Sequence, residues 1–389
     1  MMETKNLRFE TKLIHGGEPS PLIERAVTMP IFQSSTYEIG ESLTGEINYN
    51  DIKYVRLNNT PNHLALHEKI AQLEFAEAAL VSSSGMASIS SALLGLVGQG
   101  EHLMAQDNLY GGTLHFLKEF FPKMGRDVTF FPAEDTANLN KYLKPNTRAV
   151  YVESISNPLL KIPDLRAVVN FAKSHGLVSM IDNTFPSPMN FNPIPFGFDV
   201  ALHSATKYLN GHSDVVAGVM VSSFDLIKKV TPLFNHLGGC LDPHACFLLH
   251  RGIKTLGVRV GYQNESALKI SEALEKCSKV AKVIYPGLKS HPDHLRAKEW
   301  FRGFGGMVSF EFNGSTEQAD AALKQLKIPF LAPSLGGVES LYVRPSTASH
   351  SGISRTDREK LGIKDTLVRV SIGLENTQDL IEDFTRVLN

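Results

Sequence analysis

Lys207 lies in the segment HSATKYLNGHSD (203–214), which directly follows the apolar run FDVAL (198–202). An amine at the end of a buried strand loses its proton more readily than one in water, and a neutral amine is what Schiff-base chemistry requires. Ser204 and Thr206 place short hydroxyl groups beside it that can donate to phosphate oxygens. A lone lysine at a strand end more often extends to solvent. The interpretation of Lys207 therefore depends on what other strand ends bring near it.

Two further strand ends offer complementary groups. In SSSGMAS (82–88) a loop of small residues opens into a predicted helix, so the N–H groups of Gly85 and Met86 can bind a phosphate at the positive end of the helix dipole. Serine and glycine are also ordinary helix caps. In SMIDNT (179–184), Asp182 ends an apolar strand, where an ionised carboxylate needs a cationic partner such as a protonated pyridine nitrogen. A carboxylate that caps the next turn is the alternative.

The segment LYGGT (109–113) adds an aromatic ring, because Tyr110 can lie against a flat heteroaromatic cofactor. A tyrosine of the core is the alternative. An amine, a carboxylate and phosphate donors are together the groups that bind pyridoxal phosphate.

The elements that position these residues alternate regularly between strand and helix. Strands are predicted at 78–83, 101–107, 127–133, 148–154, 177–182, 198–204 and 215–223, and helices at 63–75, 85–98, 113–125, 136–143 and 163–176. This alternation predicts an α/β fold with a mostly parallel sheet covered on both faces. Ligands of such sheets bind beyond the carboxyl ends of the strands, where the residues above lie.

Three domains or segments are expected. Residues 1–60 have no regular pattern and are predicted to be an N-terminal arm that contacts a neighbouring subunit, with an ordinary surface loop region as the alternative. Residues 61–245 form the large cofactor-binding domain. Residues 246–389 form a smaller α+β domain, with a long helical stretch at 244–277, strands at 307–313 and 367–373, and helices at 316–326 and 377–388.

The composition excludes several classes of protein. The 389 residues are 42% hydrophobic and carry a net charge of −1, so no basic field indicates binding to nucleic acid or to an anionic membrane. The three cysteines lack a paired metal or redox spacing, and the charged start of the chain does not resemble a secretion signal. We expect a cytoplasmic protein with a small-molecule substrate.

The segments SSGMAS, YGGT, VESISNP, IDNTF and HSATKYLNGHSDVVAG occur in this order and spacing in the trans-sulfuration (Cys/Met metabolism) family of PLP-dependent enzymes. The chain resembles this family from about residue 10 through SLGGVESL and DTLVRVSIGLEN. The resemblance implies PLP fold type I, like that of aspartate aminotransferase, and a homotetramer built as a dimer of dimers. It also implies pyridoxal 5'-phosphate as the cofactor.

The resemblance also implies a role for each matching residue. Lys207 would bind the cofactor aldehyde, Asp182 would pair with the pyridine nitrogen, and Tyr110 would stack on the ring. Gly85, Met86, Ser204 and Thr206 match the phosphate-binding positions, while Tyr54 and Arg56 match a pair that reaches the phosphate of the neighbouring subunit. Lys207, Tyr110 and Tyr54 are the expected catalytic residues. The expected substrate-binding residues are Asn157, Ser334, Glu339 and Arg369; for Arg369, a guanidinium on the strand LVRVSIG also suits bidentate binding of a carboxylate.

A carbon–sulfur lyase that acts on cystathionine or a related sulfur amino acid is the expected activity, with β-elimination slightly favoured over γ-elimination. The alternatives are γ-replacement, as in cystathionine γ-synthases and sulfhydrylases, and a non-catalytic relative that acts as a binding protein. His115 stands where some γ-lyases have arginine, and Gly112 stands where methionine γ-lyases have cysteine. Arg344 is expected to contact a substrate carboxylate or to face solvent.

No metal site is expected. His63 and His67 are one helical turn apart, a spacing that can bind zinc, but no third ligand is evident in the sequence.

Overall fold

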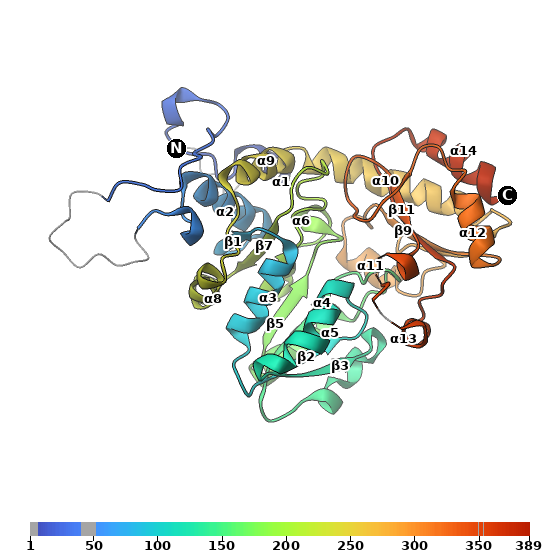
Figure 1. The fold of residues 1–389 in the computed structure, drawn as a ribbon, viewed down its shortest axis with the longest axis horizontal. Helices are drawn as coiled ribbons and strands as arrows, with labels where there is room; N and C mark the ends of the chain where they lie inside the picture. Colours follow the sequence, from blue (N-terminus) through green and yellow to red (C-terminus); the bar gives the residue numbers. More distant parts are fainter. Residues whose placement is uncertain (1–6, 40–51, 349, 353) are drawn as a thin grey trace.

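The computed structural model describes residues 7–39, 52–348, 350–352 and 354–389. Figure 1 shows a large domain with helices packed on a central sheet, a smaller domain that contains the end of the chain, and an N-terminal segment, in blue, that extends beyond the body. The helices are α1 (Phe9–His15), α2 (Pro61–Glu74), α3 (Gly85–Leu96), α4 (Gly111–His115), α5 (Leu165–His175), α6 (Ser187–Asn190), α7 (Pro193–Phe196), α8 (Phe224–Leu237), α9 (Pro243–Ile253), α10 (Leu256–Leu274), α11 (His294–Trp300), α12 (Thr316–Leu323), α13 (Arg355–Lys360) and α14 (Thr377–Leu388). The strands are β1 (Ala78–Ser82), β2 (His102–Gln106), β3 (Asp127–Phe131), β4 (Thr147–Glu153), β5 (Val178–Asp182), β6 (Val200–His203), β7 (Gly218–Ser222), β8 (Val280–Ile284), β9 (Met307–Phe312), β10 (Phe330–Leu331), β11 (Leu341–Val343) and β12 (Leu367–Ser371).

The large domain contains a seven-stranded sheet in the order β1-β7-β6-β5-β4-β2-β3. The strands from β6 to β3 are parallel, and β7 runs antiparallel to both β1 and β6. Alternate side chains of β4 enter two different cores: Val150 and Val152 pack on the face covered by α2 and α5, whereas Ala149 and Tyr151 pack on the face covered by α3 and α8. The predicted α/β fold with a mostly parallel sheet covered on both faces is confirmed.

The smaller domain contains a five-stranded sheet in the order β10-β11-β12-β9-β8, which is antiparallel except for the β10–β11 pair. Helix α10 connects the domains: Val260 in its first half packs in the core of the large domain, and Ile270 in its second half packs in that of the smaller one. No helix in the described part of the chain combines the length and apolarity that crossing a bilayer requires.

The structure differs from the sequence prediction in several helical regions. The helix predicted at 113–125 is divided into α4, a π-helical turn and a 3₁₀ turn, and helix α8 was not predicted. The stretch predicted as one long helix at 244–277 is divided into α9 and α10 at Lys254 and Thr255. Residues 136–143 do not form an α-helix, because Asp135 and Asn138 have non-helical backbone angles within a run of 3₁₀ turns. The segment 1–60 was predicted to be irregular, yet it contains α1, whose last carbonyl groups accept hydrogen bonds from the buried amine of Lys69.

The turn that follows Lys207 is fixed by a buried arginine. Arg259, which is 2% exposed, donates to the carbonyl oxygens of Tyr208 and Leu209 at 2.9 and 3.4 Å. Gly211 lies against this guanidinium with φ of +72°, and a Cβ atom there would be 1.8 Å from Nη1 of Arg259. Glycine at this position therefore allows the left-handed backbone and also the close approach of Arg259.

We predict that Gly211→Ala destabilises the protein more than Gly176→Ala does. Both glycines have positive φ, but the Cβ position of Gly176 meets no atom within 4 Å. Gly176→Ala should cost about 1 kcal/mol from backbone strain alone, whereas Gly211→Ala adds a clash with Arg259. Thermal unfolding midpoints of the two variants test this difference, and equal midpoints would show that the contact with Arg259 does not constrain the turn.

Candidate active site

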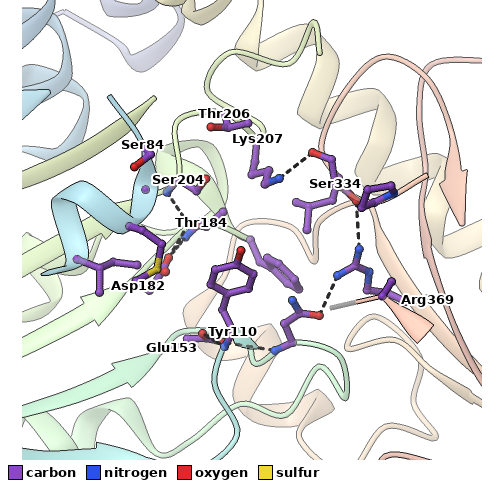
Figure 2. A pocket seen from close by; sticks show the side chains of 18 of the residues that line it. Ser84, Tyr110, Glu153, Asp182, Thr184, Ser204, Thr206, Lys207, Ser334 and Arg369 are labelled. Carbon is purple, nitrogen blue, oxygen red and sulfur yellow. Dashed lines mark hydrogen bonds between the residues drawn. The ribbon is translucent and has the colours of Figure 1, made fainter. Parts of the chain in front are cut away.

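A cavity of about 760 Å³ lies between the carboxyl ends of the parallel strands and the smaller domain. Its wall is formed by the ends of β4, β5 and β6, by the start of α3, and by the segments around Ser334, Thr347 and Arg369. Figure 2 shows these side chains converging from both domains. The cavity therefore lies where a parallel sheet is expected to bind ligands.

One end of the cavity is suited to a phosphate. The side chain of Ser84 accepts a hydrogen bond from the N–H of Ala87 at 3.1 Å and so caps α3. The N–H groups of Gly85 and Met86, also in the first turn, have no intrahelical acceptors. A Cβ atom on Gly85 would lie 2.8 Å from Cβ of Ser204, so only glycine allows the helix end to come this close to β6. The positive end of the α3 dipole and these N–H groups favour an anion.

Asp182 lies on the floor of the cavity at the end of β5 and is 8% exposed. Its Oδ1 accepts hydrogen bonds from the N–H and the hydroxyl of Thr184 at 2.9 and 2.5 Å. Burial raises the pKa of the Asp182 carboxyl, although the bonds from Thr184 and the nearby His203 oppose this change. A cation that binds at this carboxylate would stabilise its charged form.

The amine of Lys207 donates a hydrogen bond to the hydroxyl of Ser334 at 2.7 Å (Figure 2). Burial lowers the pKa of this amine to about 8, and the positive charge of Arg369 contributes to the decrease. A substantial fraction of the Lys207 side chains is therefore neutral near physiological pH, as a nucleophile or a base requires.

Arg369 is a buried cation that has no carboxylate partner in the described part of the chain. Its side chain is 4% exposed and donates to Oδ1 of Asn157 at 3.1 Å and to the carbonyl oxygen of Ser334 at 3.2 Å. No carboxylate oxygen of the described residues lies within 4.0 Å of its guanidinium, whose pKa burial lowers to about 10. Such a group is costly to bury unless an anionic ligand binds to it.

Residues 10–389 match the family described as Cys/Met metabolism PLP-dependent enzyme. The chain belongs to this family. It is 41% identical over 383 residues to the cystathionine gamma-lyase of Bacillus subtilis (strain 168), with 98% of this chain and 99% of that protein covered. It is also 41% identical over 381 residues to the cystathionine beta-lyase of Lactococcus lactis subsp. cremoris (strain MG1363), with 98% of each chain covered. The crystal structure of cystathionine gamma-lyase from Lactobacillus plantarum complexed with L-serine superposes with a TM-score of 0.91 at 36% identity, covering 98% of both chains.

The cavity fits the pyridoxal phosphate on which the family depends. The start of α3 with Ser204 would hold the phosphate, Asp182 would face the pyridine nitrogen, and Lys207 would hold the aldehyde carbon. The hydroxyl of Thr206, which also lines the cavity, exchanges hydrogen bonds with the N–H and the carbonyl of Ala217 at 3.0 and 3.2 Å, so its position is fixed. The trans-sulfuration assignment made from sequence motifs is thus confirmed, as is PLP fold type I.

Three of the residues that the family resemblance indicated do not line this cavity. Tyr54 is 39% exposed, and the guanidinium of Arg56 lies 5.5 Å from its ring centre and donates to the carbonyl of Asn235 at 3.2 Å. The carboxylate of Glu339 accepts a hydrogen bond from the hydroxyl of Ser213 at 2.9 Å. Any role of these residues in catalysis or binding remains a prediction.

The departures from the family pattern have structural explanations. The guanidinium of Arg344 donates to both carboxylate oxygens of Asp320 at 2.7 and 2.8 Å, so it neither points freely to solvent nor is available to a substrate. His115 is exposed, packs against the edge of Phe120, and does not line the cavity.

The two histidines with zinc-like spacing are engaged in hydrogen bonds. His63 contacts the hydroxyl of Thr60 and the carbonyl of Leu241, both at 2.7 Å, and His67 accepts from the N–H of Val81 at 3.1 Å. Within the residues the structure describes, no group of three or more potential ligands could hold a metal ion.

Glu153 and Thr184 are among the cavity residues that were not assigned a role from the sequence. Both are polar and lie at or just after the carboxyl end of a buried strand, as Asp182 does. The same criterion that selected Asp182 would have found them.

The low pKa of Lys207 predicts how the cofactor-free protein takes up pyridoxal phosphate. Because the neutral amine attacks the aldehyde, the rate of uptake should rise by roughly tenfold per pH unit at acidic pH and level off above about pH 8. Stopped-flow absorbance of the apoprotein across this pH range measures the profile. A plateau near the ordinary lysine value of 10.5 would contradict the environment described for Lys207.

Arg369→Gln provides the control for this measurement. Removing the guanidinium charge should move the plateau to higher pH, because Arg369 is one cause of the lowered pKa of Lys207.

Proposed function

We propose that this lyase cleaves cystathionine or a related sulfur amino acid by elimination, with β-elimination slightly favoured over γ-elimination. The observation that carries this proposal is the buried guanidinium of Arg369, without a carboxylate partner, in the same cavity as the amine of Lys207. An α-amino acid supplies the missing carboxylate. Its α-carbon would then lie close to a base that is already partly neutral.

Each residue of the cavity has a distinct task in this account. Arg369 and Asn157 bind the α-carboxylate, and Ser334 orients the amine of Lys207. Lys207 removes the proton from the α-carbon. The bound pyridoxal phosphate supplies an electron-withdrawing ring that stabilises the negative charge left on that carbon. Asp182 keeps the ring nitrogen protonated, so that this withdrawal is strong.

The proposed reaction is balanced whichever of the two carbon–sulfur bonds of cystathionine is cleaved. In β-elimination the Cβ–S bond breaks, the sulfur takes the bonding electrons and a proton, and hydrolysis of the remainder gives homocysteine, pyruvate and ammonia from cystathionine and water. In γ-elimination the Cγ–S bond breaks, and the products are cysteine, 2-oxobutyrate and ammonia. Both routes begin with loss of the α-proton to Lys207.

The slight preference for β-elimination comes from positions at which this chain differs from the family pattern. His115, which stands where some γ-lyases have arginine, does not line the cavity and so adds no charge to grip the distal carboxylate of cystathionine. The relatives named gamma-lyase and beta-lyase are equally similar to this chain, at 41% identity.

We further propose that the enzyme is a cytoplasmic homotetramer, a dimer of dimers, in which Tyr54 and Arg56 complete the phosphate site of a neighbouring subunit. In support, both residues lie outside the cavity of their own chain, and the N-terminal segment that precedes them extends beyond the body of the molecule (Figure 1).

The identity of the keto acid released from L-cystathionine tests the substrate and the direction of cleavage together. We predict pyruvate and homocysteine in excess over 2-oxobutyrate and cysteine, measured by chromatography of the derivatised products. Excess 2-oxobutyrate would reverse the preference. If neither keto acid forms, or if the enzyme makes cystathionine from an activated homoserine and cysteine faster than it cleaves it, the proposed function is wrong.

We predict that Lys207→Ala lowers keto acid release by at least about a hundredfold, the usual contribution of a positioned base. Lys289→Ala is the matched control, because Lys289 is an exposed lysine outside the cavity. A Lys207→Ala variant with near-normal turnover would show that another group removes the α-proton.

A further inference from the structure

The carboxylate of Glu153 bridges two loops of the active site. Glu153 ends β4, is 4% exposed, and lines the cavity. Its Oε1 accepts a hydrogen bond from the backbone N–H of Tyr110 at 2.5 Å, and its Oε2 accepts one from the backbone N–H of Asn157 at 3.3 Å. Figure 2 shows the carboxylate below the Tyr110 ring.

The Tyr110 loop and the Asn157 loop each carry a side chain that would contact a different ligand. Tyr110 precedes α4, and its ring is directed into the cavity, where it would lie against the cofactor. Asn157 accepts a hydrogen bond from Arg369 at 3.1 Å and would share the α-carboxylate with it. Because Glu153 binds backbone groups, it sets the positions of the loops themselves and leaves both side chains free for the ligands.

The surroundings of Glu153 hold the carboxylate in place. Its own N–H donates to Oε1 of Gln106 at 3.2 Å, and Nε2 of Gln106 donates to the carbonyl of Asn108 in the loop that leads to Tyr110. Glu153 also pairs in register with Asp182 on β5, so the two buried carboxyl groups end adjacent strands. Burial and the charge of Asp182 raise the pKa of Glu153 well above its usual range. A buried carboxyl group beside another is costly, and the hydrogen bonds from Tyr110 and Asn157 offset part of this cost.

We propose that Glu153 is a positioning residue that fixes the distance between the Tyr110 and Asn157 loops, so that the cofactor ring and the substrate α-carboxylate are bound at the same time. This inference rests on the proposed function for the ligands of Tyr110 and Asn157. It does not depend on which sulfur amino acid is cleaved.

Three variants separate this role from general stability. Glu153→Gln keeps the size of the side chain, but its amide has one acceptor oxygen and turns an N–H₂ group towards one of the two backbone donors. Glu153→Asp keeps both acceptors on a chain shorter by one methylene. Asp383→Asn is the control, because Asp383, in α14, is 6% exposed, does not line the cavity, and also accepts from two backbone N–H groups, those of Lys327 and Ile328.

The experiment is a titration of the holoenzyme with glycine, followed by the visible absorbance of the cofactor. Glycine has the α-amino and α-carboxylate groups of every substrate and no side chain. Its binding therefore measures how tightly the site holds these two groups, without carbon–sulfur cleavage. We expect the half-saturating glycine concentration to rise about tenfold in Glu153→Gln, which corresponds to one lost hydrogen bond, and to rise less in Glu153→Asp. Asp383→Asn should stay within about twofold of the wild type, since surface and remote changes rarely couple.

The inference would be overturned if a folded Glu153→Gln variant had the same half-saturating glycine concentration as the wild type. It would also be overturned if Asp383→Asn raised this concentration as much as Glu153→Gln does. If Glu153→Gln is insoluble, Glu153→Asp decides by the same criterion. A wild type that gives no response to glycine contradicts the α-amino acid site and this inference with it. If cystathionine is not cleaved and Glu153→Gln still weakens glycine, the substrate proposal fails while the role of Glu153 stands.

Discussion

The structure depends on ionisable groups that are buried around one cavity without an oppositely charged partner in direct contact. Among the described residues, Arg369, on β12, has no carboxylate oxygen within 4.0 Å, and the side chain of Asp182, at the end of β5, accepts its hydrogen bonds from the N–H and the hydroxyl of Thr184. Desolvation of each group costs free energy that the folded chain alone does not recover. In the proposed function, the substrate carboxylate and the protonated ring of the cofactor would supply the missing charges.

A comparison of two lysines shows why the geometry, and not the pKa alone, identifies the reactive amine. Burial lowers the pKa of Lys69 to about 7 and that of Lys207 to about 8, so a lowered pKa is common to both amines. The amine of Lys69, however, donates to the carbonyl oxygens of Leu13 and Ile14 and holds α1 on α2. The side chain of Lys207 lines a cavity, and its amine contacts the hydroxyl of Ser334, which lines the same cavity. A perturbed lysine is a candidate for catalysis when its amine is accessible to a ligand.

Much of the fold and of the cofactor site could be predicted from the sequence, because both follow from local patterns. The apolar runs of β4 and β6 are continuous and that of β5 is interrupted only by Ser179, as is typical of buried parallel strands, and the polar residue that ends each strand marks the carboxyl edge. The short strands β10 and β11 were missed, since runs of two and three residues are too short to give a periodic signal.

Contacts between residues far apart in the chain could not be predicted. Arg344 pairs with Asp320, which lies 24 residues away, and Glu153 reaches Tyr110, which lies 43 residues away. No local spacing indicates such pairs, because the topology of the sheets brings them together. The same reason explains α1, a helix of seven residues that is stabilised by its packing on the large domain rather than by its own sequence.

The most direct test of the account is the position of the covalent link between the protein and its cofactor. Reduction of the holoenzyme with borohydride, followed by proteolysis and mass spectrometry, locates the pyridoxyl group. The account predicts that this group is on Lys207 and that the peptide containing Lys69 is unmodified, although burial lowers the pKa of both amines. A pyridoxyl group on Lys69 or on any other lysine, with Lys207 unmodified, would contradict it.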